Sequence, residues 1–253
     1  MGYVDIFDRM KVDIPVDEKD GMTITKFEVI APGKWTEEHE KRDDVASPLS
    51  VARDAWDGRP LKPGWYTRLS EGDRIWMSDT PAERRDHAEP VFAIGSTKAE
   101  RVIINGLGIG MVLSAALSYD FVRHVDVVEI DQRVIDLVGP HYLKDPRVRI
   151  HHADAVKQMG VWGPDERWDV GWTDIWPDIN PDNLEEMKKF TDFYGPRCGY
   201  YGNWAEEEAK RAVWDNRHWD SDYMKYLTAD DEEKFEEEDE QAAEDEYADD
   251  EDE

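Results

Sequence analysis

The chain has 253 residues and a formal net charge of −29, since 60 Asp and Glu stand against 31 Lys and Arg. This length fits one large domain or one domain with an appendage, because domains usually run to about 100 to 200 residues. The charge is unevenly placed: residues 229–253 carry seventeen acids and one Lys, hence −16, which leaves −13 on residues 1–228. The body and the tail therefore call for separate interpretations.

The acidic balance argues against nucleic acid as a partner, because a phosphate backbone is bound by clustered Lys and Arg. The longest basic groupings hold only two residues each, as at Arg84-Arg85 and Lys188-Lys189. No apolar run approaches the roughly 18 residues that a membrane span needs, and the first ten residues lack the apolar core of a signal peptide. The sequence thus predicts a cytoplasmic chain with no membrane and no nucleic-acid partner.

We expect no metal site. Cys198 is the only cysteine, so an intrachain disulfide and a multi-cysteine zinc site are excluded, and without a motif it is more simply a packed residue than a nucleophile. An oxygen-rich run at 174–183 could hold Mg²⁺ or Ca²⁺, but Pro177 and Pro181 within it favour a solvated loop that caps the next helix.

Residues 1–95 predict a small β-rich unit, because their strand-forming stretches are short and separated by Pro and Gly. The stretch MTITKFEVI is rich in β-branched residues, and the hairpin that follows has Gly and Asp where a short turn needs them. A helix should begin at Pro81, with Thr80 as its cap and Glu83 three residues after the cap. The expected strands are 22–30, 64–69 and 74–78.

Residues 96–228 alternate apolar strands with helical segments, a spacing typical of parallel strands joined by right-handed crossovers. The predicted fold class is α/β, a doubly wound, mostly parallel Rossmann-like sheet. The expected strands are 101–105, 124–130, 147–152, 168–175 and 198–204. The expected helices are 111–118, 132–138, 183–193 and 205–214.

The sheet should be short, because only residues 218–227 remain between the last predicted helix and the tail. A shortened sheet leaves an edge that a second copy of the chain could cover, so a homodimer is one expected assembly. Residues 229–253 have almost no apolar side chains to bury and predict a disordered, solubilising acidic tail.

The most informative residues follow the strands, where a sheet of this kind binds its ligands. Residues 105–110 read Asn-Gly-Leu-Gly-Ile-Gly, and glycines there permit a tight turn and a close approach of a ligand to the backbone. Glu129 closes the second strand, 19 residues after this turn, where an acid can accept both hydroxyls of a ribose. Asp131 follows it, and Asp154 closes the third strand. The ordered set predicts nucleoside binding, which the glycines alone would not.

In this order the motifs resemble the class I S-adenosylmethionine-dependent methyltransferase fold, and specifically its spermidine-synthase-like branch. That branch has a glycine-rich turn running into Val-Leu, a strand ending V-x-E-x-D, then G/A-D-A/G, then Y/W-D-V-x-x-x-D. This chain has the corresponding segments at 106–113, 127–131, 153–155 and 168–174. The hairpin before the predicted sheet also resembles the small N-terminal β unit of the branch.

The resemblance implies S-adenosylmethionine as the cofactor, with the glycines against its methionine portion, the strand-two acid on the ribose and the strand-three acid near the adenine amine. The cofactor-binding residues implied in this way are Gly106, Gly108, Gly110, Glu129, Asp131, Asp154 and Ala155. Asp174 matches the acid that serves aminopropyl transfer as a base or amine anchor, and a carboxylate at a strand end can orient an acceptor and take its proton. The alternative for Asp174 is a turn or cap carboxylate.

The sequence also departs from the aminopropyltransferase pattern. The turn of those enzymes reads G-G-D-G-G, with the Asp on the free amine of the decarboxylated donor, and here that position is Ile109. The second acid after strand four is displaced to Asp178, and the Tyr-Gln/His-Glu of the family becomes His87-Ala88-Glu89. These departures favour a methyltransferase that acts on a small-molecule or medium-sized acceptor near the strand-four acid.

Other interpretations stay open at this stage. Trp172 and Trp176 are either walls of the cleft, able to attract a cation, or packing residues. An aminopropyltransferase that makes polyamines is the first alternative activity. A non-catalytic scaffold, whose acidic tail binds a basic partner, is the second alternative.

Overall fold

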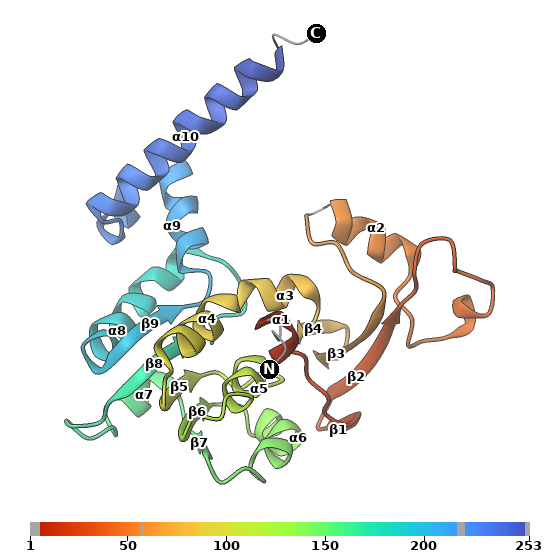
Figure 1. Cartoon of the computed structure of the whole chain (residues 1–253), viewed down its shortest axis with the longest axis horizontal. Coiled ribbons are helices and arrows are strands. Elements are labelled where there is room, and N and C mark those ends of the chain that lie inside the picture. The colour runs from red at the N-terminus through yellow and green to blue at the C-terminus, as the bar shows by residue number, and fades with distance from the viewer. Residues whose placement is uncertain (1–5, 57, 217–220, 251–253) are drawn as a thin grey trace. The chain divides into compact units, whose positions relative to one another are not determined.

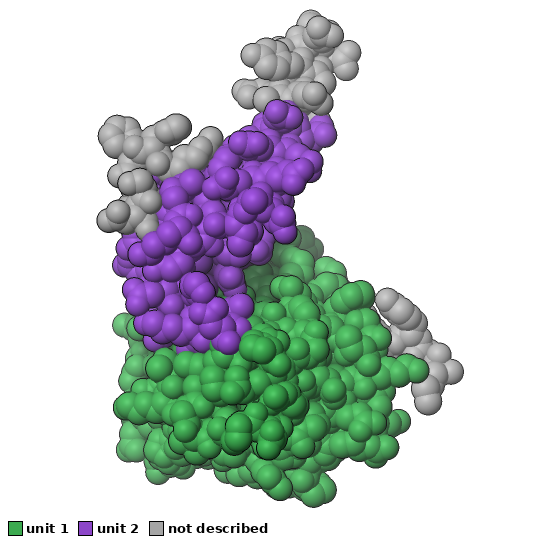
Figure 2. All heavy atoms as spheres, turned by 90° about the vertical axis from the view of Figure 1, so that its left-hand side faces the viewer, with its two compact units in different colours: residues 1–175, 193–204 green, residues 176–192, 205–253 purple. Residues whose placement is uncertain are grey.

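A computed structural model describes residues 6–56, 58–216 and 221–250. The chain divides into two compact units, which Figure 2 colours separately. Unit 1 comprises residues 1–175 and 193–204 and contains both β-sheets of the described residues, whereas unit 2 comprises residues 176–192 and 205–253 and is helical. The predicted domain boundaries after residues 95 and 228 stay predictions.

The first sheet of unit 1 is antiparallel, with the order β1-β2-β3-β4. Ile24 of one strand faces Leu69 of the next, and both side chains are completely buried. The pairing with the last strand shifts between Leu69 and Ser70, which marks an irregularity of the β-bulge kind. The predicted strand and hairpin are confirmed. The strands are β1 (Asp17–Lys19), β2 (Met22–Val29), β3 (Gly64–Glu71) and β4 (Arg74–Ser78).

The helix predicted from Pro81 is interrupted at His87, which has φ −107° and ψ 14° and separates α3 (Pro81–Asp86) from α4 (Ala88–Thr97). Pro90 explains the break, because it has no N–H to bond the carbonyl of residue 86 and its ring crowds that carbonyl. Pro81 occupies the first turn as expected, but the side chain of Thr80 makes no cap hydrogen bond. The backbone of His87 is therefore not part of either helix.

The second sheet of unit 1 is parallel, with the order β7-β6-β5-β8-β9, so the predicted fold class is confirmed (Figure 1). The strand order reverses at β5, whose neighbours are β6 and β8. Asn105 is paired with Thr173, so the residues that follow β5 and β8 start side by side at this switch point. The strands are β5 (Arg101–Asn105), β6 (His124–Glu129), β7 (Val148–His152), β8 (Trp168–Thr173) and β9 (Cys198–Asn203).

Helices flank the parallel sheet, and the buried core of unit 1 runs through both sheets, joining Ile24 and Leu69 to Val102 and Val127. The further helices of the chain before residue 200 are α1 (Ile6–Arg9), α2 (Pro48–Trp56), α5 (Met111–Leu117), α6 (Gln132–Tyr142), α7 (Ala155–Met159) and α8 (Leu184–Tyr194). Short 3₁₀ segments lie at 39–41, 181–183, 195–197 and 221–226. Across the described residues, no helix has the length and apolar character needed to cross a bilayer.

Unit 2 includes α9 (Glu206–Asp215) and α10 (Ala229–Asp250). Here the structure differs from the predicted disorder of the acidic tail. Thr228 and Asp231 form a reciprocal capping arrangement, in which each side chain accepts the backbone N–H of the other. Phe235 is 2% exposed and packs against Trp214, with 6.1 Å between ring centroids. One capped end and one buried aromatic residue thus fix the start of a helix that charge composition alone did not predict.

Candidate active site

The backbone of the glycine turn after β5 has positive φ angles at Gly106 and Gly108, and neither position has room for a side chain. Gly106 has φ +97°, and a Cβ there would overlap the carbonyl oxygen of Asp174. Gly108 has φ +49°, and a Cβ there would overlap the thioether of Met77. The missing side chain of Gly106 therefore lets Asp174, the acid after β8, lie directly against the turn.

Met77, on β4, covers the middle of this turn. Its Sδ accepts the backbone N–H of Ile109 at 3.1 Å, and a thioether is a weak acceptor. The side chain of Ile109 is fully buried, so the position of the aminopropyltransferase acid holds an inward-facing alkyl group.

Glu129 closes β6 as predicted and is bound to the glycine turn. One carboxylate oxygen accepts the N–H of Leu107 at 2.8 Å, and the other accepts the N–H of Asp131 at 2.7 Å. Burial raises the pKa of Glu129, against the effect of these N–H donors. The N–H of Ile130 also acts on this carboxylate, so three of its about four acceptor sites are engaged and one is left. The residues present thus fit a nucleoside that donates a ribose hydroxyl to Glu129.

The other two predicted acids serve as helix caps in this structure. Asp131 accepts the N–H of Arg133 at 2.8 Å and also pairs with its guanidinium, which holds the pKa of the carboxyl below its usual range. Asp154 accepts the N–H of Val156 at 2.9 Å and so caps α7, where Ala155 is buried in the first turn. Their role in cofactor binding stays a prediction. The capping contacts are compatible with it, because a capping carboxylate retains further lone pairs.

Asp174 pairs with His87, the residue at the break between α3 and α4. The Nε2 of His87 lies 2.7 Å from Oδ2 of Asp174, and the Nδ1 lies 2.7 Å from the carbonyl oxygen of Glu83. The side chain of His87 is 4% exposed and that of Asp174 is 22% exposed. Burial disfavours the imidazolium, but the hydrogen bond and charge of Asp174, aided by Glu83, outweigh it and raise the pKa of His87 to about 9. At neutral pH the pair is therefore an imidazolium beside a carboxylate.

The aromatic candidates are packing residues by their burial. Trp172 is 2% exposed, belongs to the core of unit 1, and its indole N–H has no hydrogen-bond partner among the described residues. Trp176 belongs to unit 2, where it packs edge-on against Phe190 and donates its N–H to Glu186 at 3.0 Å. The oxygen-rich loop after it is held by its own caps, since Asn180 accepts the N–H of Asp182.

Burial raises the pKa of the Cys198 thiol to about 12, which keeps it protonated and a poor nucleophile. In the described residues, no group of three His, Cys, Asp or Glu side chains is arranged to hold a metal ion.

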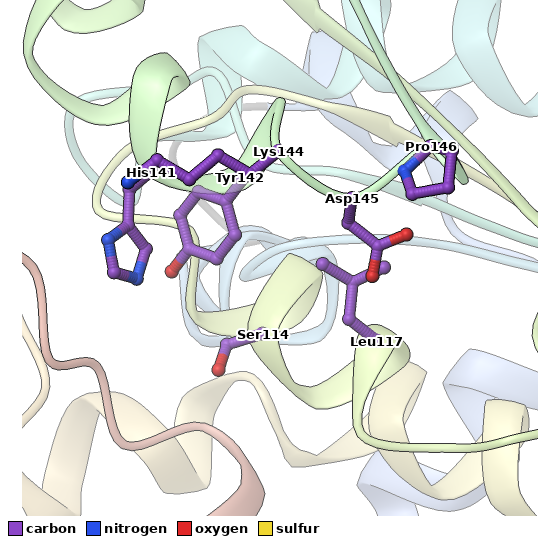
Figure 3. A pocket seen from close by; sticks show the side chains of 7 residues that line it. All are labelled: Ser114, Leu117, His141, Tyr142, Lys144, Asp145 and Pro146. Carbon is purple, nitrogen blue, oxygen red and sulfur yellow. The ribbon is translucent and has the colours of Figure 1, made fainter.

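A pocket of about 490 Å³ is lined by α5, the end of α6 and residues 144–146 (Figure 3). Tyr142 contributes to its wall and hydrogen-bonds the carbonyl oxygens of Ile109 and Gly110 at 3.1 and 3.2 Å. Through Tyr142 the pocket adjoins the glycine turn, but neither Glu129 nor Asp174 lines it. Its lining residues are Ser114, Leu117, His141, Tyr142, Lys144, Asp145 and Pro146.

Two residues of this site were not among the predicted ones. His87 entered the sequence analysis only as a departure from a family motif, and Met77 did not enter it. Their partners, Asp174 and Ile109, lie 87 and 32 residues further along the chain. No local pattern signals either contact, because both depend on tertiary packing.

Comparison with curated proteins supports the resemblance over part of the chain. A polyamine aminopropyltransferase of Prochlorococcus marinus (strain MIT 9313) is 34% identical over 93 residues, which cover 33% of this chain and 32% of that protein. Polyamine aminopropyltransferase 2 of Ralstonia nicotianae is 31% identical over 105 residues, covering 38% of this chain and 20% of that protein. The chain spans a third or less of the length of these relatives. No protein-family model matches it.

Among solved structures, an SAH-bound methyltransferase from Podospora anserina is 18% identical, with 44% of this chain and 47% of that one covered and a TM-score of 0.34. A candidate caffeoyl-CoA O-methyltransferase from Staphylococcus aureus is 18% identical, with 60% and 62% covered and a TM-score of 0.35. At TM-scores this low, the assignment of the fold rests on the strand order rather than on these structures.

Proposed function

We propose that this chain is an S-adenosylmethionine-dependent methyltransferase acting on a small or medium-sized acceptor beside Asp174. The observation that carries the proposal is the contact between the glycine turn and the strand-four acid, where the place of a Gly106 side chain is taken by the carbonyl of Asp174. A donor on the turn and an acceptor on Asp174 would share one site. Such proximity is the main requirement of methyl transfer.

When bound, S-adenosylmethionine supplies an electrophilic methyl group on a sulfonium. The chain's own part is to bind and orient. Glu129 keeps an acceptor site for a ribose hydroxyl, since its contacts with the N–H groups of Leu107, Asp131 and Ile130 leave one of its about four lone-pair sites. Asp174 uses Oδ2 for His87, and Oδ1 makes no hydrogen bond within the described part of the chain, so this oxygen is available to orient an acceptor.

Aminopropyl transfer is the second candidate, favoured by the 34% identity with a curated aminopropyltransferase. It requires a site for the free amine of a decarboxylated donor. Ile109 provides none, because its side chain is an alkyl group that is fully buried. The two activities use different donors, so measuring which donor binds distinguishes them.

The test is calorimetric titration of the full chain with S-adenosylmethionine, S-adenosylhomocysteine and the decarboxylated donor. We expect the two carboxylate-bearing ligands to bind more tightly than the decarboxylated one. Glu129→Ala should weaken their binding at least tenfold, because it removes the ribose acceptor and frees the turn. Asp136→Ala, at an exposed position of α6, is the matched control and should bind like the wild type.

Three results would count against the proposal. Absence of binding by every donor would remove the nucleoside site altogether. Unchanged affinity in Glu129→Ala, with the variant folded by its thermal melt, would remove the role of the strand-two acid. Tighter binding of the decarboxylated donor would favour the aminopropyltransferase.

A further inference from the structure

His87 is a cation held against the acid that would meet the acceptor. Both of its ring nitrogens are engaged, Nδ1 with the carbonyl of Glu83 and Nε2 with Asp174. It therefore has no free nitrogen with which to touch a substrate or to take its proton. Its effect on the site must pass through Asp174.

The surroundings of the pair keep this cation in place. The charged groups facing it are the carboxylates of Asp174 and Glu83. Glu83 in turn faces Arg59 and Asp86, with the guanidinium of Arg59 3.9 Å from Glu83 and 2.8 Å from Asp86. Arg59 thus compensates much of the acidic charge behind the imidazole, which leaves the Asp174 carboxylate as the close partner of His87.

We propose that His87 is the specificity-determining residue of the acceptor site, selecting acceptors that are uncharged at the reacting atom over polyamines. This inference rests on the proposed function, because it names the acceptor class of the same site. A bare carboxylate at a strand end attracts an ammonium group. With His87 bonded at 2.7 Å, the acid presents an ion pair with no net charge and one free oxygen, Oδ1.

The consequence for the acceptor follows from electrostatics. A cationic amine near Asp174 would gain the attraction of the carboxylate and suffer the repulsion of the imidazolium at a similar distance, so little net attraction is left. A hydroxyl can donate its hydrogen bond to Oδ1 without bringing a second positive charge. A hydroxyl-bearing small molecule is thus the acceptor class that this pair accommodates.

The experiment compares the binding of putrescine, a small diamine, to wild type, His87→Gln and the double variant His87→Gln/Asp174→Asn. Calorimetry at pH 7 should show weak binding to the wild type. His87→Gln retains a hydrogen-bonding side chain but removes the positive charge, so putrescine should bind at least tenfold more tightly. The double variant should lose this gain, because the exposed carboxylate is gone.

A pH profile provides a readout that a purely structural role of His87 would not move. The probe is a bis-quaternary alkyl diammonium ion, whose charge does not change with pH. Its affinity for the wild type should rise between pH 7.5 and pH 10 as His87 loses its proton, and that for His87→Gln should stay flat.

The outcomes separate the two proposals. If the diamine binds wild type and His87→Gln equally, or if the gain survives in the double variant, His87 does not set the acceptor class. If S-adenosylhomocysteine fails to bind the wild type, the proposed function fails, and the inference falls with it whatever the diamine does. If S-adenosylhomocysteine binds and only the diamine result is negative, methyl transfer stands and the acceptor class alone is overturned.

Discussion

The proton on His87 should make the stability of unit 1 depend on pH in a range where few other groups titrate. The pKa of His87 rises from 6.5 to about 9 on folding. One pKa unit corresponds to 1.36 kcal/mol, so the bound proton stabilises the folded chain by about 3 kcal/mol. Because the side chain is 4% exposed, solvent screening reduces this value little.

The sign follows from proton linkage. A histidine whose folded pKa is raised contributes its full stabilisation below the unfolded pKa, here 6.5, and loses it as the pH rises through about 9. The free energy of unfolding should therefore fall by about 3 kcal/mol between these two pH values.

The assay is urea unfolding of wild type, His87→Gln and the control His152→Gln, each at pH 6.5, 7.5 and 9. His152 is exposed, and its Nε2 contacts only the carbonyl of Ile130, at 3.1 Å. Wild type and control should lose stability in parallel, and His87→Gln should lose about 3 kcal/mol less across the range. Parallel curves for His87→Gln and wild type would refute the charged state of the pair. An NMR titration of the His87 ring gives a second reading in case the variant is poorly folded.

Three further changes test the structure. Gly106→Ala should cost about 3 kcal/mol or more in urea unfolding and abolish donor binding, because its Cβ overlaps backbone. Gly72→Ala, also at positive φ but with open space around it, should cost only about 1 kcal/mol. Asp126→Ala leaves the buried indole N–H of Trp168 and the part-buried rings of His124 and His151 without their acceptor and should destabilise unit 1 by about 3 kcal/mol, also read by urea. Phe235→Ala should reduce the far-UV helical signal, since its packing on Trp214 secures α10; an unchanged spectrum would contradict this.

The parallel sheet could be predicted because its signals are local. The strand 101–105 is an apolar run that ends at a glycine, and β5 has the same bounds. The order of strands follows from crossover handedness, which leaves few topologies for such an alternation. The antiparallel sheet was predicted less fully: the strand at 17–19 is short and polar, and it gains its strand geometry only by pairing with β2.

Two features that the sequence analysis missed have different physical reasons. The split at His87 could have been inferred from Pro90, but not its consequence, since the contact with Asp174 is made across the fold. The helix α10 was missed because net charge was weighed above the capping pair Thr228 and Asp231, which is visible in the sequence. In the first case the deciding contact forms only on folding, whereas in the second a local signal was given less weight than the charge.

Two of the departures from the aminopropyltransferase pattern act in the same direction. Ile109 removes a negative charge from the donor side of the site, and His87 neutralises the negative charge that remains on the acceptor side. Each alone would weaken the attraction for an amine, and together they reduce it at the donor position of Ile109 and at the acceptor position of Asp174. Methyl transfer to a hydroxyl needs neither charge, because its donor already carries the positive sulfonium and its acceptor is neutral. The acidity of the chain as a whole therefore says little about its ligand; in the proposed site, His87 and Ile109 set the charge that the ligand would meet.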